Sequence, residues 1–330
     1  MLPNESDTLL LLEGIKQKER RALARAITRV ESHPQQSHQI VSSLYRQKLL
    51  MRSRVVGITG PPGAGKSTLT GYLIRHLRAE GNTVGVLLID PSSPFTGGAL
   101  LGDRVRMADS NTDPGVFIRS MGSRGHLGGL SLATQDAVAL MDAYGFDYIL
   151  IETVGIGQAE TEIMKTADLT VVVAVPGLGD EIQIIKAGIM EIGDIFVVNK
   201  ADRDGAERVV TEINMMLDMA PTANALSLPR PPVLRCTANR DKGVLELMLA
   251  IQECFGLLED SLALEKRRQE RIWQAVNESV KSQLLLQLQP FISSEARHDI
   301  VDRIQSGDSS PYEESLSLLE ILKRVYNQEG

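Results

Sequence analysis

Cysteine is nearly absent from this sequence. Only Cys236 and Cys254 occur in 330 residues, too few for a disulfide framework or for a zinc site built from cysteine. The histidines are few and scattered along the chain: His33, His38, His76, His126 and His298. We therefore expect reduced thiols, as in the cytosol, and no metal site built from a cysteine and histidine cluster.

Long apolar runs are absent as well. The longest candidate, Leu169 to Val175, has the length of a strand and falls far short of the roughly 20 residues that span a bilayer. The first residues, Met1 to Asp7, are acidic rather than basic, and the apolar run Leu9 to Leu12 is too short for the core of a signal peptide. We expect a cytoplasmic protein with no membrane partner.

An excess of positive charge is also missing. The formal net charge is −7 and the sequence pI is about 5.4, so the chain has no general electrostatic footprint for nucleic acid. Four arginines do lie among apolar positions of helical spacing: Arg20, Arg21, Arg25 and Arg29. A solvated helix surface is the favoured interpretation of these arginines, and a basic face for an anionic partner is the alternative.

From Val55 to about Phe255, short β-rich runs alternate with amphipathic segments of helical length. Several runs are continuous in Val, Ile and Leu, which is typical of strands covered by helices on both faces. The predicted strands are Val55 to Thr59, Val84 to Asp90, Val116 to Arg119, Tyr148 to Glu152, Leu169 to Val175, Ile195 to Asn199 and Val233 to Cys236. This predicts a doubly wound, mainly parallel α/β sheet whose ligands gather at the carboxyl ends of the strands.

Helical spacing extends beyond both ends of this region. Leu9 to Leu50 predicts two helices interrupted at His33-Pro34. Three further helices are predicted at the other end of the chain: Ser261 to Gln289, Glu295 to Ile304 and Tyr312 to Asn327. We expect an N-terminal helical arm of residues 1–52, a central α/β domain of residues 53–258 and a C-terminal helical arm of residues 259–330. The C-terminal helices suit an oligomerisation or partner surface, and packing against the chain's own α/β domain is the alternative.

A glycine-rich segment lies between the first predicted strand and a helix-compatible stretch, Leu69 to Ala79. It consists of Gly60, Pro61, Pro62, Gly63, Ala64, Gly65, Lys66, Ser67 and Thr68. Its pattern is that of a phosphate-binding P-loop, in which the backbone N–H groups face inward and the next helix adds its positive dipole end. Lys66 is placed to reach the outer phosphates and the Ser67 hydroxyl to bind Mg²⁺. The segment predicts a site for a nucleoside triphosphate.

Acidic residues follow two other predicted strands. Asp90 ends the second strand, where a carboxylate beside a P-loop can hold Mg²⁺ or orient water, and a turn or cap role is the alternative. Asp103 lies in the glycine-flanked stretch Thr96 to Arg106, which can move with the γ-phosphate. Glu152 and Gly155 occupy the place of the Asp-x-x-Gly element of GTPases, with the Gly155 N–H available to the γ-phosphate.

The segment Asn199-Lys200-Ala201-Asp202 ends the strand that begins at Ile195. Asp202 can accept two hydrogen bonds from the edge of guanine, which adenine does not offer, and rejection of the wrong base leaves a carboxylate unpaired. Asn199 is expected to tie the base site to the P-loop, and the Lys200 stem to cover the ring. Further along, Cys236, Thr237 and Ala238 end the last strand, where a backbone N–H commonly contacts the guanine oxygen. The predicted ligands are GTP and GDP.

At this point the chain resembles the MeaB/ArgK family of P-loop GTPases. The resemblance covers nearly the whole sequence, and the combination of motifs that carries it is specific. The matching segments are G-P-P-G-A-G-K-S-T at 60–68, I-D-P-S-S at 89–93, G-A-L-L-G-D-R at 98–104, E-T-V-G-I-G-Q at 152–158, V-P-G-L-G-D-E-I-Q at 175–183 and N-K-A-D at 199–202.

The resemblance implies a GTPase chaperone of adenosylcobalamin-dependent mutases, chiefly methylmalonyl-CoA mutase. Such a protein gates cofactor loading and protects or reactivates the mutase. The resemblance also implies a homodimer, with residues 53–258 as the GTPase domain and residues 259–330 as the dimerisation arm. Val175 to Lys186 is implied to be an additional switch.

The predicted catalytic residues are Lys66, Asp90, Asp103 and Glu152. The motif matches imply that Mg²⁺ is held by Ser67, Asp90, Asp103 and Glu152. Slow intrinsic hydrolysis is expected, because the sequence singles out no catalytic glutamine or arginine among Gln158, Arg104, Arg106 and Arg124.

Two other classes of protein share the P-loop. A small-molecule kinase would need an acceptor pocket and usually a lid, and N-K-A-D argues instead for guanine recognition by a regulatory GTPase. A metal-delivery GTPase would share the fold and the switches but should contain a cluster of cysteine and histidine, which the scattered histidines do not provide. The sequence favours a GTPase with Mg²⁺ as its metal.

Overall fold

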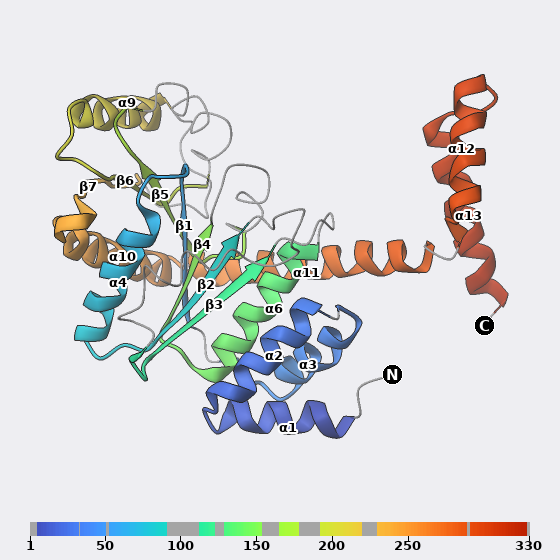
Figure 1. The fold of residues 1–330 in the computed structure, drawn as a ribbon, viewed down its shortest axis with the longest axis horizontal. Helices are drawn as coiled ribbons and strands as arrows, with labels where there is room; N and C mark the ends of the chain where they lie inside the picture. Colours follow the sequence, from blue (N-terminus) through green and yellow to red (C-terminus); the bar gives the residue numbers. More distant parts are fainter. Residues whose placement is uncertain are drawn as a thin grey trace. The chain divides into compact units, whose positions relative to one another are not determined.

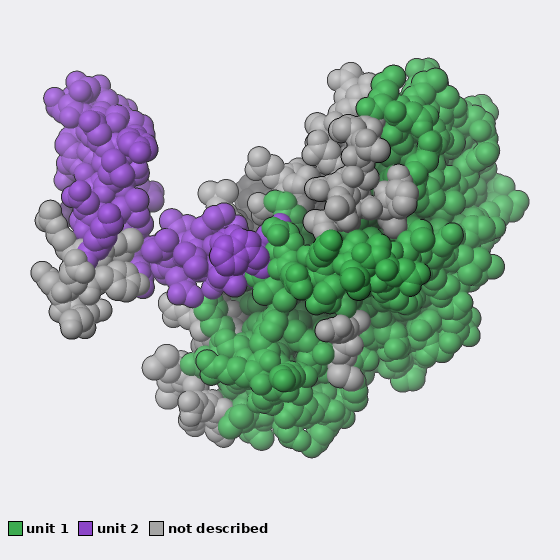
Figure 2. Space-filling view, turned by 180° about the vertical axis from the view of Figure 1, so that it is seen from behind, with its two compact units in different colours: residues 1–272 green, residues 273–330 purple. Residues whose placement is uncertain are grey.

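The computed structural model describes residues 5–32, 34–50, 53–90, 112–122, 129–153, 165–177, 192–219, 230–288 and 291–328. The chain divides into two compact units, residues 1–272 and residues 273–330 (Figure 2). The larger unit contains the sheet and the P-loop.

The first unit is built on a seven-stranded sheet in which all paired strands are parallel. The strands are β1 (Arg54–Thr59), β2 (Val84–Asp90), β3 (Val116–Gly122), β4 (Tyr148–Thr153), β5 (Leu169–Ala174), β6 (Ile195–Val198) and β7 (Val233–Arg235), in the spatial order β3-β2-β4-β1-β5-β6-β7. All seven predicted strands are confirmed, and so is the parallel α/β class. The largest difference is at β3, which continues three residues beyond the predicted end at Arg119.

The continuous apolar runs arise because both faces of the sheet are covered. In β2, the side chains of Val84, Val86 and Leu88 join a hydrophobic cluster on one face, whereas those of Leu87 and Ile89 join a cluster on the other. This is the period-two alternation of a strand with no solvent-facing side. The first face is covered by α4 (Lys66–Ala79) and α10 (Val244–Asp260). Over β5 and β6, the other face is covered by α9 (Ala206–Met219).

The N-terminal helices cover the remainder of the second face together with α6 (Gly129–Tyr144). They lie beside α6 in Figure 1. The structure has three of them, α1 (Glu5–Lys16), α2 (Arg20–Ser32) and α3 (Pro34–Arg46), so the prediction of two helices was wrong. The additional break is at Lys18, whose left-handed φ of 62° ends α1. The predicted break at His33-Pro34 is confirmed, because α3 begins at Pro34.

The second unit consists of the distal part of α11 (Ala263–Leu288) with α12 (Ser294–Ser306) and α13 (Pro311–Gln328). The Ser293 side chain caps α12, Gly307 ends it with a φ of 83°, and Arg303 pairs with Glu314 of α13 at 2.8 Å. The three predicted C-terminal helices are therefore confirmed. In the part of the chain that the structure describes, no helix combines the length and apolar character needed to cross a membrane.

Candidate functional site

The glycines of the P-loop are required by its backbone. Gly60, Gly63 and Gly65 have φ values of 141°, 75° and 87°, which side chains disfavour. A Cβ atom on Gly60 would lie 2.2 Å from the Val173 carbonyl oxygen, and one on Gly65 would lie 2.5 Å from Nδ2 of Asn199. Gly65 is also the N-cap of α4 and provides no side-chain acceptor. No side chain at the N-cap accepts from the first N–H groups of α4, which point toward the loop as they do in a helix that binds an anion.

Two lysine ammonium groups lie against this loop. Lys66 is buried, and its Nζ donates to the carbonyl oxygens of Gly60 and Pro61, the latter at 3.0 Å. Lys200 reaches the loop from the carboxyl end of β6 and donates to the Gly63 carbonyl at 2.6 Å. The backbone of Lys200 has a φ of 56°, a left-handed conformation that turns the chain sharply after the strand. Together the two lysines concentrate positive charge where phosphates would bind.

Ser67 and Glu152 are brought into direct contact. The Ser67 hydroxyl donates to Oε1 of Glu152 at 2.5 Å, and Glu152 is only 1% exposed. The contact follows from the sheet order, because β4 lies beside β1 with Glu152 opposite Ile58, just before the P-loop. Hydroxyl and carboxylate oxygens are the donor type that Mg²⁺ takes in proteins. Ser67 and Glu152 therefore have the chemistry of a magnesium site.

Other members of the predicted metal set lie partly or wholly outside the described residues. Asp90 is the last residue of β2. The residue before it, Ile89, is in register with Thr153 of β4. The side chain of Asp90 is not among those described. Asp103 and Gly155 are outside the described residues altogether, so their roles remain predictions. Within the described ranges, no group of three or more histidine, cysteine or acidic side chains is arranged to hold a metal.

Asn199 joins the P-loop to the segment that follows β7. Its Nδ2 donates to the Ala64 carbonyl at 2.8 Å, and its Oδ1 accepts from the Ala238 N–H at 3.1 Å. The side chain is 2% exposed, so both hydrogen bonds are shielded from water. Asn199 directly follows β6, and its one buried amide links the P-loop to the segment after β7.

The Asp202 carboxylate remains accessible. Its side chain is 35% exposed, and its ion pair with Arg240 is 3.7 Å long. Arg240 ends the short 3₁₀ helix η3 (Ala238–Arg240), which follows directly on Thr237. An accessible carboxylate is compatible with the predicted hydrogen bonds to guanine, which stay a prediction.

Cys236, Thr237 and Ala238 form a rigid support for this region. Their N–H groups donate to Val198, Lys242 and Asn199 respectively, at 2.9, 2.9 and 3.1 Å. Each of these donors is thus engaged within the protein, and the predicted contact of this segment with guanine remains a prediction. Burial, with a smaller effect of Glu246, raises the pKa of the Cys236 thiol to about 12, which suits a packing residue rather than a nucleophile.

Thr59 and Thr153 form a buried pair that no sequence motif had indicated. The Thr153 hydroxyl donates to that of Thr59 at 3.2 Å, and both residues are buried. Thr59 precedes Gly60, and Thr153 follows Glu152. The signal in the sequence was a polar residue at the carboxyl end of each of two neighbouring apolar strands.

The comparisons with known proteins agree with these motifs. The family model described as "Methylmalonyl Co-A mutase-associated GTPase MeaB" matches residues 23–290. A Pyrococcus abyssi protein provisionally named a GTPase is 49% identical over 302 residues, with 92% of this chain and 93% of that protein covered. GTPase ArgK of Escherichia coli is 36% identical over 293 residues, covering 86% of each chain.

Two further similarities come from a mammalian protein and a solved structure. The mouse mitochondrial methylmalonic aciduria type A homolog is 34% identical over 280 residues, covering 80% of this chain and 67% of the mouse protein. The crystal structure of a LAO/AO transport system kinase aligns with a TM-score of 0.73 at 27% identity, covering 98% of this chain and 100% of that one. The chain belongs to the family of methylmalonyl-CoA mutase-associated GTPases described as MeaB, and it is a P-loop GTPase.

Proposed function

We propose that this GTPase is a nucleotide-dependent chaperone of an adenosylcobalamin-dependent mutase, with methylmalonyl-CoA mutase as the first candidate. In this role it gates cofactor loading and protects or reactivates the mutase. The description of the family and the name of the mouse relative support the mutase as the partner. The single observation that carries a switching role is the hydrogen bond from Ser67 to Glu152, because it joins the P-loop helix to the strand that leads into residues 154–164.

GTP hydrolysis is proposed to use Mg²⁺ held by Ser67, Asp90, Asp103 and Glu152. When bound, the ion neutralises charge on the β- and γ-phosphates. Lys66 stabilises the charge that develops on the γ-phosphate as water attacks in line, and the N–H groups at the start of α4 hold the phosphates in place. Intrinsic hydrolysis is proposed to be slow, so that partner binding completes the site.

Guanine selection is assigned to Asp202, with Asn199 and Lys200 shaping the base site. The proposed protein is cytoplasmic and homodimeric, with residues 259–330 as the dimerisation arm and no nucleic acid or membrane partner. Exposed apolar side chains in the second unit support a role for that unit in association: Trp273, Val276, Val280, Leu285 and Leu316 are each at least 45% exposed.

A nucleotide-dependent pull-down tests the chaperone role. The immobilised full-length chain is incubated with purified methylmalonyl-CoA mutase in the presence of GTP, GDP, a non-hydrolysable GTP analogue or no nucleotide. We expect retention of the mutase to depend on which nucleotide is present. If no mutase is retained in any of the four conditions, the chaperone assignment fails and the GTPase remains.

A small-molecule kinase is the second candidate, because the solved relative with a TM-score of 0.73 is named a transport system kinase. The two functions differ in where the γ-phosphate goes. With γ-labelled GTP, a GTPase releases all of the label as inorganic phosphate, whether or not amino acids such as arginine are added. Label appearing on an added acceptor would identify a kinase.

A further inference from the structure

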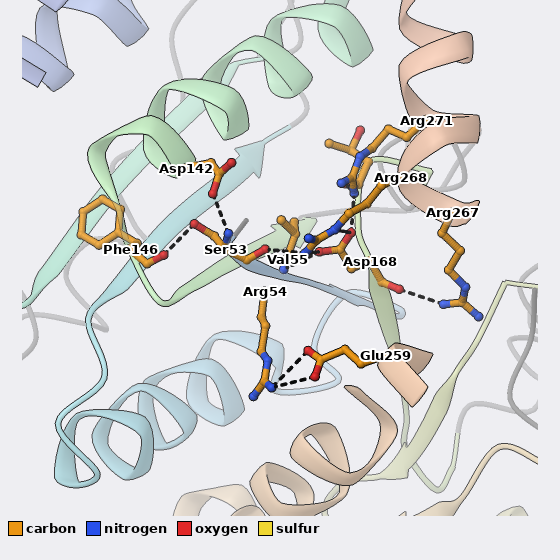
Figure 3. A network of polar contacts seen from close by, with 11 residues as sticks. Ser53, Arg54, Val55, Asp142, Phe146, Asp168, Glu259, Arg267, Arg268 and Arg271 are labelled. Atoms are coloured by element: carbon orange, nitrogen blue, oxygen red, sulfur yellow. Dashed lines mark hydrogen bonds and ion pairs between the residues drawn. The ribbon is translucent and has the colours of Figure 1, made fainter. Parts of the chain in front are cut away.

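A cluster of ion pairs lies at the amino ends of the strands, whereas the P-loop follows the carboxyl end of β1. It joins three arginines of α11, Arg267, Arg268 and Arg271, to two aspartates that immediately precede strands, Asp168 before β5 and Asp194 before β6. Part of it is shown in Figure 3. All five residues belong to the first unit. None of them had been assigned a role from the sequence motifs.

Asp168 is the centre of the cluster. It is fully buried, and its carboxylate accepts from the Val55 N–H at 3.1 Å, from Arg268 Nη2 at 2.9 Å and from Arg271 Nη1 at 2.9 Å. Arg268 also donates to the Ser53 carbonyl at 3.0 Å. One helix therefore holds the start of β1 directly and through Asp168.

Asp194 makes the corresponding contacts for β5 and β6. Its carboxylate accepts from the Thr170 N–H at 2.9 Å and from both terminal nitrogens of Arg267, at 2.8 and 3.0 Å. Arg267 also donates to the Asp168 carbonyl oxygen at 2.8 Å, and Arg271 donates to the Thr166 carbonyl at 2.7 Å. The arginines thus fix backbone atoms of the segment before β5 as well as carboxylates.

The three strands that begin at this cluster each lead into a segment with a predicted role at the nucleotide site or as a switch. β1 leads into the P-loop, β6 leads into Asn199 to Asp202, and β5 leads into Val175. In addition, residues 154–164 follow β4 and rejoin the described chain at Lys165, and residues 178–191 rejoin it at Ile192. Thr166 and Asp168, which closely follow Lys165, and Asp194, which closely follows Ile192, are held by arginines of α11.

Apolar residues could attach α11 to the sheet at a lower desolvation cost than buried charges. Ala263 and Leu264 do so in the first turn of the helix. What the hydrogen-bonded arginines add is a fixed position, because each donor meets a particular carboxylate or carbonyl oxygen. A shift at the start of β1, β5 or β6 therefore changes the contacts of α11, and a shift of α11 changes the contacts of these strands.

We propose that Arg267, Arg268 and Arg271 are positioning residues that couple α11 to the nucleotide site. In consequence, GTP and GDP give α11 different environments, and binding of a partner to residues 273–330 alters GTP hydrolysis by the reciprocal effect. This inference rests on the proposed use of GTP hydrolysis as a switch. It is independent of which partner the switch serves.

The chain contains its own probe for this coupling. Trp273 is the sole tryptophan, lies on α11 two residues after Arg271, and is 59% exposed. Acrylamide quenching of its fluorescence is measured on the full-length chain with GDP and with a non-hydrolysable GTP analogue. We expect the quenching constant to differ between the two nucleotides, and this difference to be lost in Arg267→Gln and Arg271→Gln.

Three matched variants separate coupling from simple destabilisation. Lys266→Gln removes a charge from an exposed position of the same helix and should keep the nucleotide-dependent difference. Arg271→Lys should restore it, because the contacts of Arg271 with the Thr166 carbonyl and with Asp168 are both made by Nη1, which an ammonium can replace. Arg267→Lys should not, because Arg267 needs two nitrogens for Asp194.

Steady-state kinetics provide a second readout. Active sites are counted by GDP binding, so that a variant that only unfolds loses sites without changing kcat per site. Loss of coupling should change kcat per site and leave the KM for GTP close to that of the wild type. The proposal is overturned if the wild-type quenching constant is the same with both nucleotides, or if Arg267→Gln retains both the wild-type difference and the wild-type kcat. Because no mutase enters these measurements, failure of the chaperone assignment would appear only in the pull-down.

Discussion

Replacing Asn199 with alanine tests how the site is held together. The buried side chain makes one hydrogen bond to the Ala64 carbonyl and one to the Ala238 N–H. In the Asn199→Ala variant both backbone groups keep their positions but lose their partner. The substitution therefore acts on the P-loop and on the segment after β7 at the same time, without touching a group that is expected to contact phosphate.

The expected cost follows from the two buried backbone groups. Leaving a buried donor or acceptor unsatisfied costs about 1–3 kcal/mol each, so the two together cost about 2–6 kcal/mol. Water entering the space left by the amide reduces this figure, and we expect the free energy of unfolding to fall by about 3 kcal/mol. Because the P-loop loses its attachment to the base site, GTP and GDP should both bind more weakly, and to a similar extent.

The assay combines urea unfolding with titration of a fluorescent guanine nucleotide. Asn214→Ala is the control, because Asn214 also makes two hydrogen bonds, to the Val210 carbonyl and from Arg230, but lies in a half-buried position on α9. We expect it to cost no more than about 1 kcal/mol and to leave nucleotide affinity unchanged. The reasoning is refuted if Asn199→Ala matches this control in both measurements.

Three further predictions concern the base, the metal and the thiols. Asp202→Asn should weaken GTP binding and favour xanthine nucleotides, and unchanged GTP affinity in a competition assay would exclude Asp202 from base recognition. Glu152→Gln keeps an acceptor for the Ser67 hydroxyl but removes the negative charge, so hydrolysis should require a higher Mg²⁺ concentration, and an unaltered Mg²⁺ titration would remove Glu152 from the metal set. Burial raises the pKa of both Cys236 and Cys254 to about 12. The unfolded chain loses these thiol protons at lower pH than the folded chain does. The free energy of unfolding should therefore fall by up to about 1.4 kcal/mol per thiol per pH unit above about pH 9. If urea unfolding gives the same free energy from pH 8 to pH 10, the burial of the thiols is contradicted.

The sheet was predictable because its strands are buried on both faces. Val84 to Asp90 and Leu169 to Val175 read as apolar runs without solvent-facing positions, which few other structures require. The break between the first two helices was not predictable in the same way. It lies at Lys18, in a left-handed conformation, with no glycine or proline to mark it. Tertiary packing of three helices against α6 imposes that turn, and local sequence does not encode it.

The arrangement of the P-loop and its neighbours was predictable from motifs because its contacts are local or follow from the order of the strands. Gly60 and Gly65 have the backbone angles that only glycine adopts readily, and the parallel sheet places Glu152 beside Ser67. What the sequence did not indicate is the hydrogen bonding that surrounds these groups. The Thr59–Thr153 pair depends on β1 and β4 being neighbours, and the order of strands in a sheet is a property of the fold as a whole.

Aspartates lie at both ends of the strands, and their surroundings distinguish structural residues from candidate ligand-binding residues. Asp168 and Asp194 at the amino ends each accept from a backbone N–H and from arginine, and both are almost completely buried. Their acceptor capacity is therefore used by the protein itself. Asp202 at a carboxyl end is 35% exposed and has an arginine only at 3.7 Å, which leaves its carboxylate accessible to a ligand. The sequence alone does not distinguish structural from ligand-binding aspartates, because all three flank an apolar strand. The arginines that donate to Asp168 and Asp194 lie more than 70 residues away from them in the chain.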